Sequence, residues 1–198
     1  MLYVLGTQFC SEINFATLVN LDKIGMFVNP NDVLIKLDLR EDMQAADLGC
    51  GSGSWVLELA KILKHGFVFA VDVQEEPLSA LEGKAKHQGL RNVRTITADL
   101  EKGVDKISNA SCDFVILANI LFQLDDKEAV FMTAVRILKN GGKLLVVDWK
   151  EDSSLGPKEG RVSMSDIEDI AKNIGLKEVQ NLEQETGAYH YGLVFTKP

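Results

Sequence analysis

The chain has 198 residues, which favours one domain, because domains typically hold about 100 to 200 residues. Its composition, 46% hydrophobic and 25% charged, is that of an ordinary globular protein and excludes disordered, collagen-like and coiled-coil classes. With 21 basic against 29 acidic residues the net charge is -8, which gives no general attraction to phosphate backbones or anionic lipids. Nucleic acid is therefore a disfavoured partner.

The cysteines are Cys10, Cys50 and Cys112, an odd number without the spacing of a metal site. Neither a disulfide framework nor a bound metal is expected, and a reducing cytoplasm fits best. The first residues lack the basic and long apolar regions of a leader, and no run approaches the roughly 18 apolar residues of a membrane span. We expect a cytoplasmic monomer or homodimer.

Residues 1–28 do not share the alternating strand and helix pattern that follows, and we interpret them as an N-terminal segment and a candidate lid. Asn29 as N-cap and Pro30 at the first helical position predict a short helix that leads into the domain proper, residues 29–198.

From residue 43 onwards apolar runs alternate with segments of helical period, the pattern of a parallel sheet with crossover helices. The runs predict strands at 43–48, 66–72, 93–98, 113–119 and 142–149. Apolar residues at helical spacing mark the buried stripes of two helices: Val56, Leu59, Ala60 and Leu63, then Phe131, Ala134, Val135 and Leu138. Asn140-Gly141 is a stop signal before the fifth strand.

The last part of the chain departs from this alternation. Ser165 and Glu168 have the spacing of a capping box and predict a helix over 164–174. Two strands then follow at 176–185 and 189–197, joined by a glycine-containing loop, so an antiparallel hairpin should close the sheet.

A glycine loop follows the first strand and runs directly into a helix. It reads Asp47-Leu-Gly49-Cys-Gly51-Ser-Gly53-Ser54. Closely spaced glycines let the backbone approach a ligand, and the helix start offers free N–H groups. Asp72 ends the second strand 21 residues after Gly51, where its carboxylate can accept both hydroxyls of a ribose.

This loop differs from the dinucleotide fingerprint G-x-G-x-x-G, because Ser54 stands where the last glycine is required. The acidic Asp47 ahead of the glycines is not part of that fingerprint either. An NAD-dependent oxidoreductase is therefore only an alternative, and a ribose-bearing ligand without pyrophosphate fits better.

In its order of motifs the sequence resembles the class I S-adenosylmethionine-dependent methyltransferases over about residues 27–198. Four segments carry the resemblance: the glycine loop, Val71-Asp72-Val73, Ala98-Asp99-Leu100 and Leu138-Lys-Asn-Gly-Gly-Lys143. The resemblance implies an α/β Rossmann-like doubly wound sheet of seven strands in the order 3-2-1-4-5-7-6. It also implies S-adenosylmethionine as cofactor and S-adenosylhomocysteine as product.

The resemblance further implies a role for each matching residue. The loop residues Asp47, Gly49, Cys50, Gly51 and Gly53 would lie under the methionine part of the cofactor. Asp72 would bind the ribose, Asp99 the adenine amino group, and Val73 and Leu100 would flank the ring, while Asn119 would face the methionine or the acceptor.

The segment after the fourth strand bears on the acceptor. Asn119-Ile-Leu-Phe122 lacks the Asp/Asn-Pro-Pro-Tyr/Phe motif of amide and adenine-amino methyltransferases and is closer to ubiquinone/menaquinone-type and arsenite-type enzymes of small molecules. Arsenite itself is disfavoured, because only Cys10 and Cys50 are plausible thiol ligands, and Cys50 is better explained as a packed loop residue.

Side chains at the rim are the candidates for contact with the acceptor: Phe122, Trp149, Tyr189 and Tyr191. His190 is the best acid/base candidate, although an aromatic-rich strand start is equally well explained by packing. Methyl transfer from a sulfonium depends mainly on positioning, so a catalytic residue is not required.

Two further alternatives stay open. One is a methyltransferase of RNA or protein with an open substrate face, and the other is a noncatalytic module that binds S-adenosylmethionine. The connection between Lys150 and Val162 is short, so a cover for the acceptor has to come from residues 1–28, a partner subunit or the substrate itself.

Overall fold

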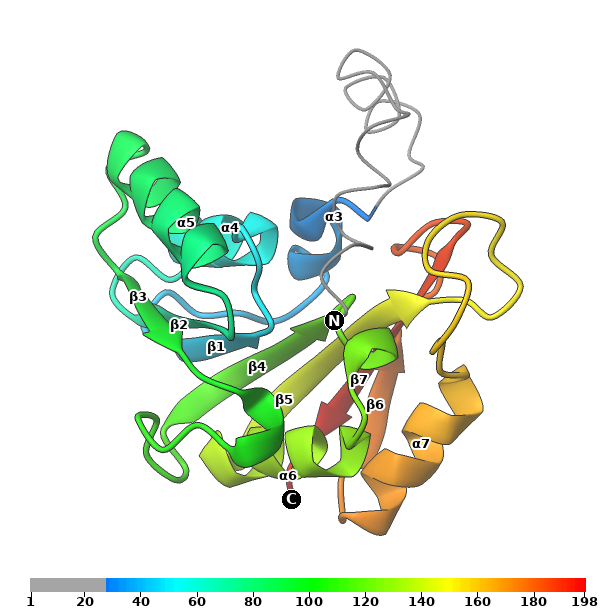
Figure 1. The fold of residues 1–198 in the computed structure, drawn as a ribbon. Helices are drawn as coiled ribbons and strands as arrows, with labels where there is room; N and C mark the ends of the chain where they lie inside the picture. The colour runs from blue at the N-terminus through cyan, green and yellow to red at the C-terminus, as the bar shows by residue number, and fades with distance from the viewer. Residues whose placement is uncertain (1–27) are drawn as a thin grey trace.

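Seven strands form one mixed sheet in the order β3-β2-β1-β4-β5-β7-β6 in the computed structural model, which describes residues 28–198 (Figure 1). The strands are β1 Gln44–Leu48, β2 Phe67–Asp72, β3 Val93–Thr97, β4 Cys112–Ala118, β5 Leu138–Trp149, β6 Lys177–Asn181 and β7 His190–Thr196. Strands β1 to β5 pair in parallel, and β7 runs antiparallel to both β5 and β6. The predicted fold class and strand order are confirmed. The predicted lid lies in residues 1–28, almost all outside the described part.

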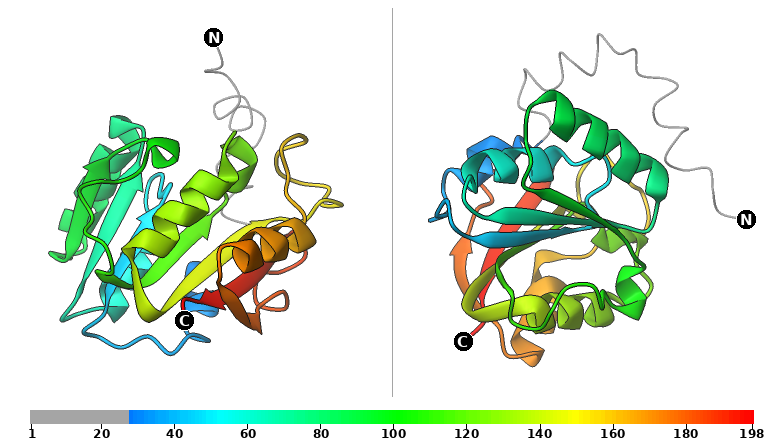
Figure 2. Two further views of the ribbon diagram at one scale, coloured as in Figure 1. Left: turned by 90° about the horizontal axis from the view of Figure 1, so that it is seen from below. Right: turned by 90° about the vertical axis from the view of Figure 1, so that its left-hand side faces the viewer.

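Helices cover both faces of the sheet (Figure 2). They are α3 Pro30–Leu34, α4 Ser54–Ile62, α5 Glu75–His87, α6 Lys127–Ile137 and α7 Met164–Asn173, with the short 3-10 turns η1 Leu100–Lys102 and η2 Leu121–Gln123. Helices α3, α4 and α5 lie on one face, and α6 and α7 on the other. None of the helices in the described part is long and apolar enough to cross a membrane.

The core consists of two apolar layers, one on each face of the sheet. Along β4 the side chains alternate between them: Phe114 and Ile116 pack toward α4, whereas Val115 and Leu117 pack toward α6. All four are at most 1% exposed, and burying such a side chain stabilises the fold by about 1.5 to 3 kcal/mol. The central strands are therefore fixed firmly, and the carboxyl edge of the sheet is a rigid base for a site.

Helix α7 begins two residues earlier than the predicted capping box requires. Ser163 is the N-cap, and its Oγ accepts a hydrogen bond from the backbone N–H of Asp166 at 3.0 Å. The predicted helix over 164–174 is confirmed, but the prediction of Ser165 and Glu168 as the capping pair was wrong, because Ser163 and Asp166 have the same spacing two residues earlier.

Asn140-Gly141 does not end a helix before a loop. Strand β5 follows α6 without a break, and these two residues form an irregular stretch inside it, where the pairing register with β4 shifts. Gly141 has a φ of +77°, and its N–H donates to the carbonyl of Lys197 at 2.7 Å. The stop signal was therefore misread, since an αL glycine also suits a bulge.

Candidate active site

The glycine loop joins β1 to α4 at the carboxyl edge of the sheet. The N–H groups of Gly49 and Cys50 both donate to the carbonyl of Val71, at 2.8 and 2.9 Å, which folds the loop over the end of β2. Gly53 has a φ of +84°, and a Cβ there would overlap the side chain of buried Leu81. Glycine is required at this position for both reasons, conformation and space.

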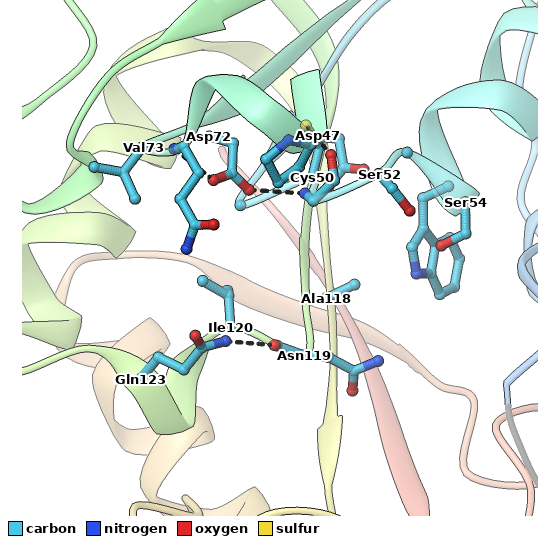
Figure 3. Close-up of a pocket in the computed structure, with 16 residues that line it drawn as sticks. Asp47, Cys50, Ser52, Ser54, Asp72, Val73, Ala118, Asn119, Ile120 and Gln123 are labelled. Carbon is cyan, nitrogen blue, oxygen red and sulfur yellow. Dashed lines mark hydrogen bonds between the residues drawn. The ribbon is translucent and has the colours of Figure 1, made fainter. Parts of the chain in front are cut away.

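Asp72 ends β2 and ties the loop to it. Its Oδ2 accepts the N–H of Gly51 at 2.8 Å, and its Oδ1 accepts the N–H of Gln74 at 2.9 Å (Figure 3). Each carboxylate oxygen has two acceptor positions, so one position on each oxygen remains for a ligand. Two neighbouring acceptors of this kind match the two hydroxyls of a ribose.

Asp47 is the most unusual group of the site. Its side chain is 1% exposed, and its Oδ2 has no hydrogen-bond partner among the described residues. Burial, and next the negative charge of Asp72, raise the pKa of Asp47 to about 7. A buried carboxylate without a partner is costly, so this position favours a ligand that brings a positive charge or a hydrogen-bond donor.

The end of β4 forms the opposite wall. Asn119 has a φ of +54°, and its N–H donates to the carbonyl of Val147 at 2.8 Å. Its Oδ1 is buried without a partner in the described structure, and its backbone carbonyl accepts the Nε2 of Gln123 at 3.4 Å. Ile120 lies between them and faces the glycine loop (Figure 3).

A cavity of about 400 Å³ separates the two walls, within the range of about 300 to 1,000 Å³ that holds small ligands. The predicted cofactor residues that line it are Asp47, Gly49, Cys50, Gly51, Gly53, Asp72, Val73 and Asn119. The lining contains two carboxylates and, within the described part, no Lys, Arg or His. Burial raises the pKa of the Cys50 thiol, which therefore stays protonated.

Sequence reasoning missed several lining residues: Ser52, Ser54, Trp55, Gln74, Pro77, Ala118, Ile120 and Gln123. All of them lie next to the motif residues in the chain. Proximity to a motif was the available signal, but it does not tell which neighbours turn toward the cavity.

Asp99 and Leu100, predicted on the adenine side, are not among the lining residues. Asp99 caps η1 by accepting the N–H of Glu101 and pairs with Lys102 at 2.8 Å. These contacts with Lys102 and Glu101 hold the pKa of Asp99 below its ordinary value. Leu100 is buried in the core.

The residues predicted on the acceptor side, Phe122, Trp149, Tyr189 and Tyr191, do not line this cavity either. Tyr191 is 1% exposed and donates its hydroxyl proton to the carbonyl of Val162 at 3.1 Å, on the α7 face of the sheet. Its contacts are those of a core residue.

His190 is buried against Trp149 at the start of β7. The ring centroids are 4.0 Å apart, and His190 is 1% exposed. Neither ring nitrogen has a partner among the described residues, and burial together with the charge of Lys150 lowers the pKa of His190 to about 4. The imidazole is therefore neutral at pH 7 and does not reach the cavity lining.

The loop between β5 and α7 packs against the indole of this pair. Gly156 packs directly on the indole of Trp149. Arg161 determines the shape of the loop, because its guanidinium donates to the backbone carbonyls of five loop residues: Lys150, Glu151, Ser153, Leu155 and Pro157. All three guanidinium nitrogens donate to carbonyls of the loop, so the cation is held without a carboxylate.

Known proteins share both the sequence pattern and the fold. A family model described as a methyltransferase domain matches residues 39–187. The chain is 34% identical over 116 residues to a probable cobalt-precorrin-6B C(15)-methyltransferase (decarboxylating) of Methanosarcina mazei, covering 52% of this chain and 61% of that protein. It is 26% identical over 126 residues to demethylmenaquinone methyltransferase of Geobacillus stearothermophilus, covering 63% and 53%. The chain thus spans about half to three fifths of these curated relatives.

Among solved structures, a SAM-dependent methyltransferase from Aquifex aeolicus superposes with a TM-score of 0.79 at 26% identity, covering 87% of this chain and 91% of that one. These findings confirm the prediction of S-adenosylmethionine as cofactor and speak against the NAD alternative. Since the family model matches most of the chain and the strand order agrees, this chain belongs to the class I S-adenosylmethionine-dependent methyltransferases.

Proposed function

We propose that this chain transfers the methyl group of S-adenosylmethionine to a small-molecule acceptor at the carboxyl edge of the sheet. The charge of the cavity carries the proposal: Asp47 and Asp72 line it, and no cationic side chain does so in the described structure. The cofactor brings a sulfonium and an ammonium group, both positive, and the partnerless oxygen of Asp47 is available to one of them.

The residues present fit the cofactor. Asp72 has one free acceptor position on each oxygen for the ribose, and the glycine loop brings backbone close to the methionine part. Val73 is 62% exposed at the cavity and offers an apolar surface to the adenine ring. We keep Asp99 as the second adenine contact only on the family resemblance, because its carboxylate is engaged with Lys102.

When bound, the cofactor supplies a methyl carbon that is already activated for in-line displacement. The task of the chain is then to hold the donor, align the acceptor and exclude water. A dedicated base is needed only for an acceptor that must lose a proton before it reacts.

A small molecule is favoured over RNA as the acceptor for electrostatic reasons. The net charge is -8, and the carboxylates at the site would repel a phosphate backbone. The names of the relatives point the same way, because a precorrin and demethylmenaquinone are small molecules. A protein acceptor remains an alternative that only turnover can test.

His190 is our candidate for a base, with Trp149 beside it as part of the acceptor surface. Its imidazole is neutral at pH 7 and can accept a proton, but a pKa of about 4 makes it a weak base there. The ring lies outside the cofactor cavity, so an acceptor would have to reach it under the loop that covers Trp149.

The proposal is tested by calorimetry with S-adenosylhomocysteine and by release of that product in the presence of candidate acceptors. Asp72→Ala should weaken binding by about 1.5 to 3 kcal/mol, the scale for a lost hydrogen bond to a charged group. Asp113→Ala is the matched control, because this carboxylate is partly buried, accepts the N–H of Gln44 and does not line the cavity. Equal affinity of wild type and Asp72→Ala would contradict the ribose assignment. Turnover with RNA or protein but with no small molecule would contradict the acceptor class.

A further inference from the structure

We propose that Asp148 is a positioning residue for the cofactor site, because its carboxylate fixes the turn Asn119–Leu121 that forms one wall of the cavity. This inference rests on the proposed function. It assigns a role in cofactor binding to a residue that does not line the cavity.

Asp148 lies near the end of β5 and is fully buried. Its Oδ2 accepts the N–H of Leu121 at 3.0 Å, and its Oδ1 accepts the N–H of Trp149 at 2.8 Å. The N–H of Ile120 lies close enough to the carboxylate to lower its pKa. The carboxylate thus holds the turn through the N–H of Leu121, which has no other hydrogen-bond partner among the described residues.

The turn needs such an anchor because its backbone is strained. Asn119 has a φ of +54°, a left-handed conformation that is unfavourable for a residue with a Cβ. One end is held by the hydrogen bond from its N–H to the carbonyl of Val147. The carboxylate of Asp148 holds the other end.

Ile120 transmits the position of the turn to the site. Its Cγ1 lies 2.7 Å from the place that a Cβ on Gly49 would occupy, so the isoleucine closes directly on the glycine loop. Ile120 and Gly49 both line the cavity. A displacement of the turn therefore changes the width of the cavity between its two walls.

Charged and titratable groups around Asp148 come from three neighbouring elements. Lys127 on α6 lowers the pKa of Asp148, and Tyr191 on β7 is its register partner. Burial is the larger effect and raises the pKa of Asp148 to about 6. Asp47 on β1 titrates in the cavity itself, so the pH profile of the wild type alone does not isolate Asp148.

The experiment compares the dissociation constant of S-adenosylhomocysteine for wild type and Asp148→Asn at pH 8 and pH 5.5. The asparagine keeps the shape but places an NH2 group or a weaker acceptor against the N–H groups of the turn. At pH 8 we expect at least about fivefold weaker binding by the variant, the lower end of measured couplings between two sites. At pH 5.5 the ratio of the two constants should fall to about twofold, because about three quarters of the wild-type carboxyls are then protonated. The contribution of Asp47 cancels in this ratio.

Asp113→Asn is the matched control. Asp113 is a partly buried carboxylate that accepts a backbone N–H, that of Gln44 at 2.9 Å, at the opposite end of the sheet. It should lose stability without a change in the dissociation constant at either pH.

A ratio that is the same at both pH values, or an equal weakening in Asp113→Asn, would overturn the inference and leave Asp148 a purely structural residue. Absence of binding by the wild type would overturn the proposed function, and this inference with it. If Asp148→Asn does not fold, the inference is tested by NMR on the wild type, through the amide resonance of Leu121. It should titrate with a midpoint near pH 6 and move when S-adenosylhomocysteine binds, and a resonance that does neither overturns the inference.

Discussion

Asp47 should release a proton when the cofactor site is filled. In the free protein its pKa is about 7, because the carboxylate is buried, lies near Asp72 and has an oxygen without a partner among the described residues. The ammonium group of S-adenosylhomocysteine placed within about 4 to 6 Å would lower this pKa by about 1 to 3 units.

The size of the effect follows from these values. At pH 7 about half of the Asp47 side chains are protonated before binding, so about half a proton should be released for each ligand bound. With a pKa lowered by about two units, linkage gives about fivefold tighter binding at pH 7 than at pH 6. Affinity rises with pH because the ionised carboxylate is the form that attracts the cation.

The free protein should show the opposite trend in its stability. A folded-state pKa above the unfolded value means that the unfolded chain holds the ionised form more easily. The contribution of Asp47 to stability is therefore greatest below pH 4 and is lost as the pH rises toward 7. Asp47→Asn should then be more stable than the wild type at pH 8.

Calorimetry in buffers of different ionisation enthalpy measures the proton release directly. Asp47→Asn should release almost no proton at pH 7, whereas Asp113→Asn, far from the site, should behave as the wild type does. The reasoning is refuted if the wild type releases no proton, or if Asp47→Asn releases as much as the wild type.

Two other predictions concern the loop and the buried histidine. Gly53→Ala should destabilise the fold by at least about 1 kcal/mol, because the φ of +84° and the side chain of Leu81 both oppose a Cβ. Gly83→Ala in α5 should stabilise the fold by about 0.5 to 1 kcal/mol, because nothing lies within 4 Å of its Cβ position. Urea unfolding measures both variants, and equal effects would contradict the requirement for glycine at position 53. His190→Gln should leave the affinity for S-adenosylhomocysteine unchanged, because the ring lies outside the cavity. Loss of turnover in this variant with intact binding supports a base, and unchanged turnover assigns His190 to packing with Trp149.

The fold was predictable where a single local rule dominates. Buried parallel strands such as β4 are apolar on both faces, and Gly51 and Gly53 mark a sharp turn before a helix whatever surrounds them. The strand order came from the family resemblance and not from periodicity. The errors at Ser165 and at Asn140-Gly141 have different causes: Ser163 offered an equivalent cap two residues earlier, whereas the pairing of β5 with β4 took Asn140-Gly141 into an irregular part of the strand.

Site residues that belong to a sequence motif were predictable, whereas residues that act through contacts between strands were not. Asp47 and Asp72 lie in recognisable motifs at strand ends, and both line the cavity. Ile120 and Asp148 act through contacts between neighbouring strands, which the sequence of either strand alone does not reveal. Tyr191 was predicted at the rim from its position at a strand start, yet β-strand alternation turns it to the α7 face, away from Trp149 and His190.

The loop held by Arg161 has a consequence for which of its residues can be exchanged. Every hydrogen bond of the guanidinium goes to a main-chain carbonyl, which all residue types provide. The path of the loop therefore depends on few of its own side chains: Ser153 bonds to Leu155 within the loop, and Gly156 and Gly160 pack closely on Trp149 and Phe122. Its outward positions can be exchanged while the backbone is retained, and under the proposed function, with Trp149 on the acceptor surface, they are the positions to vary for acceptor preference.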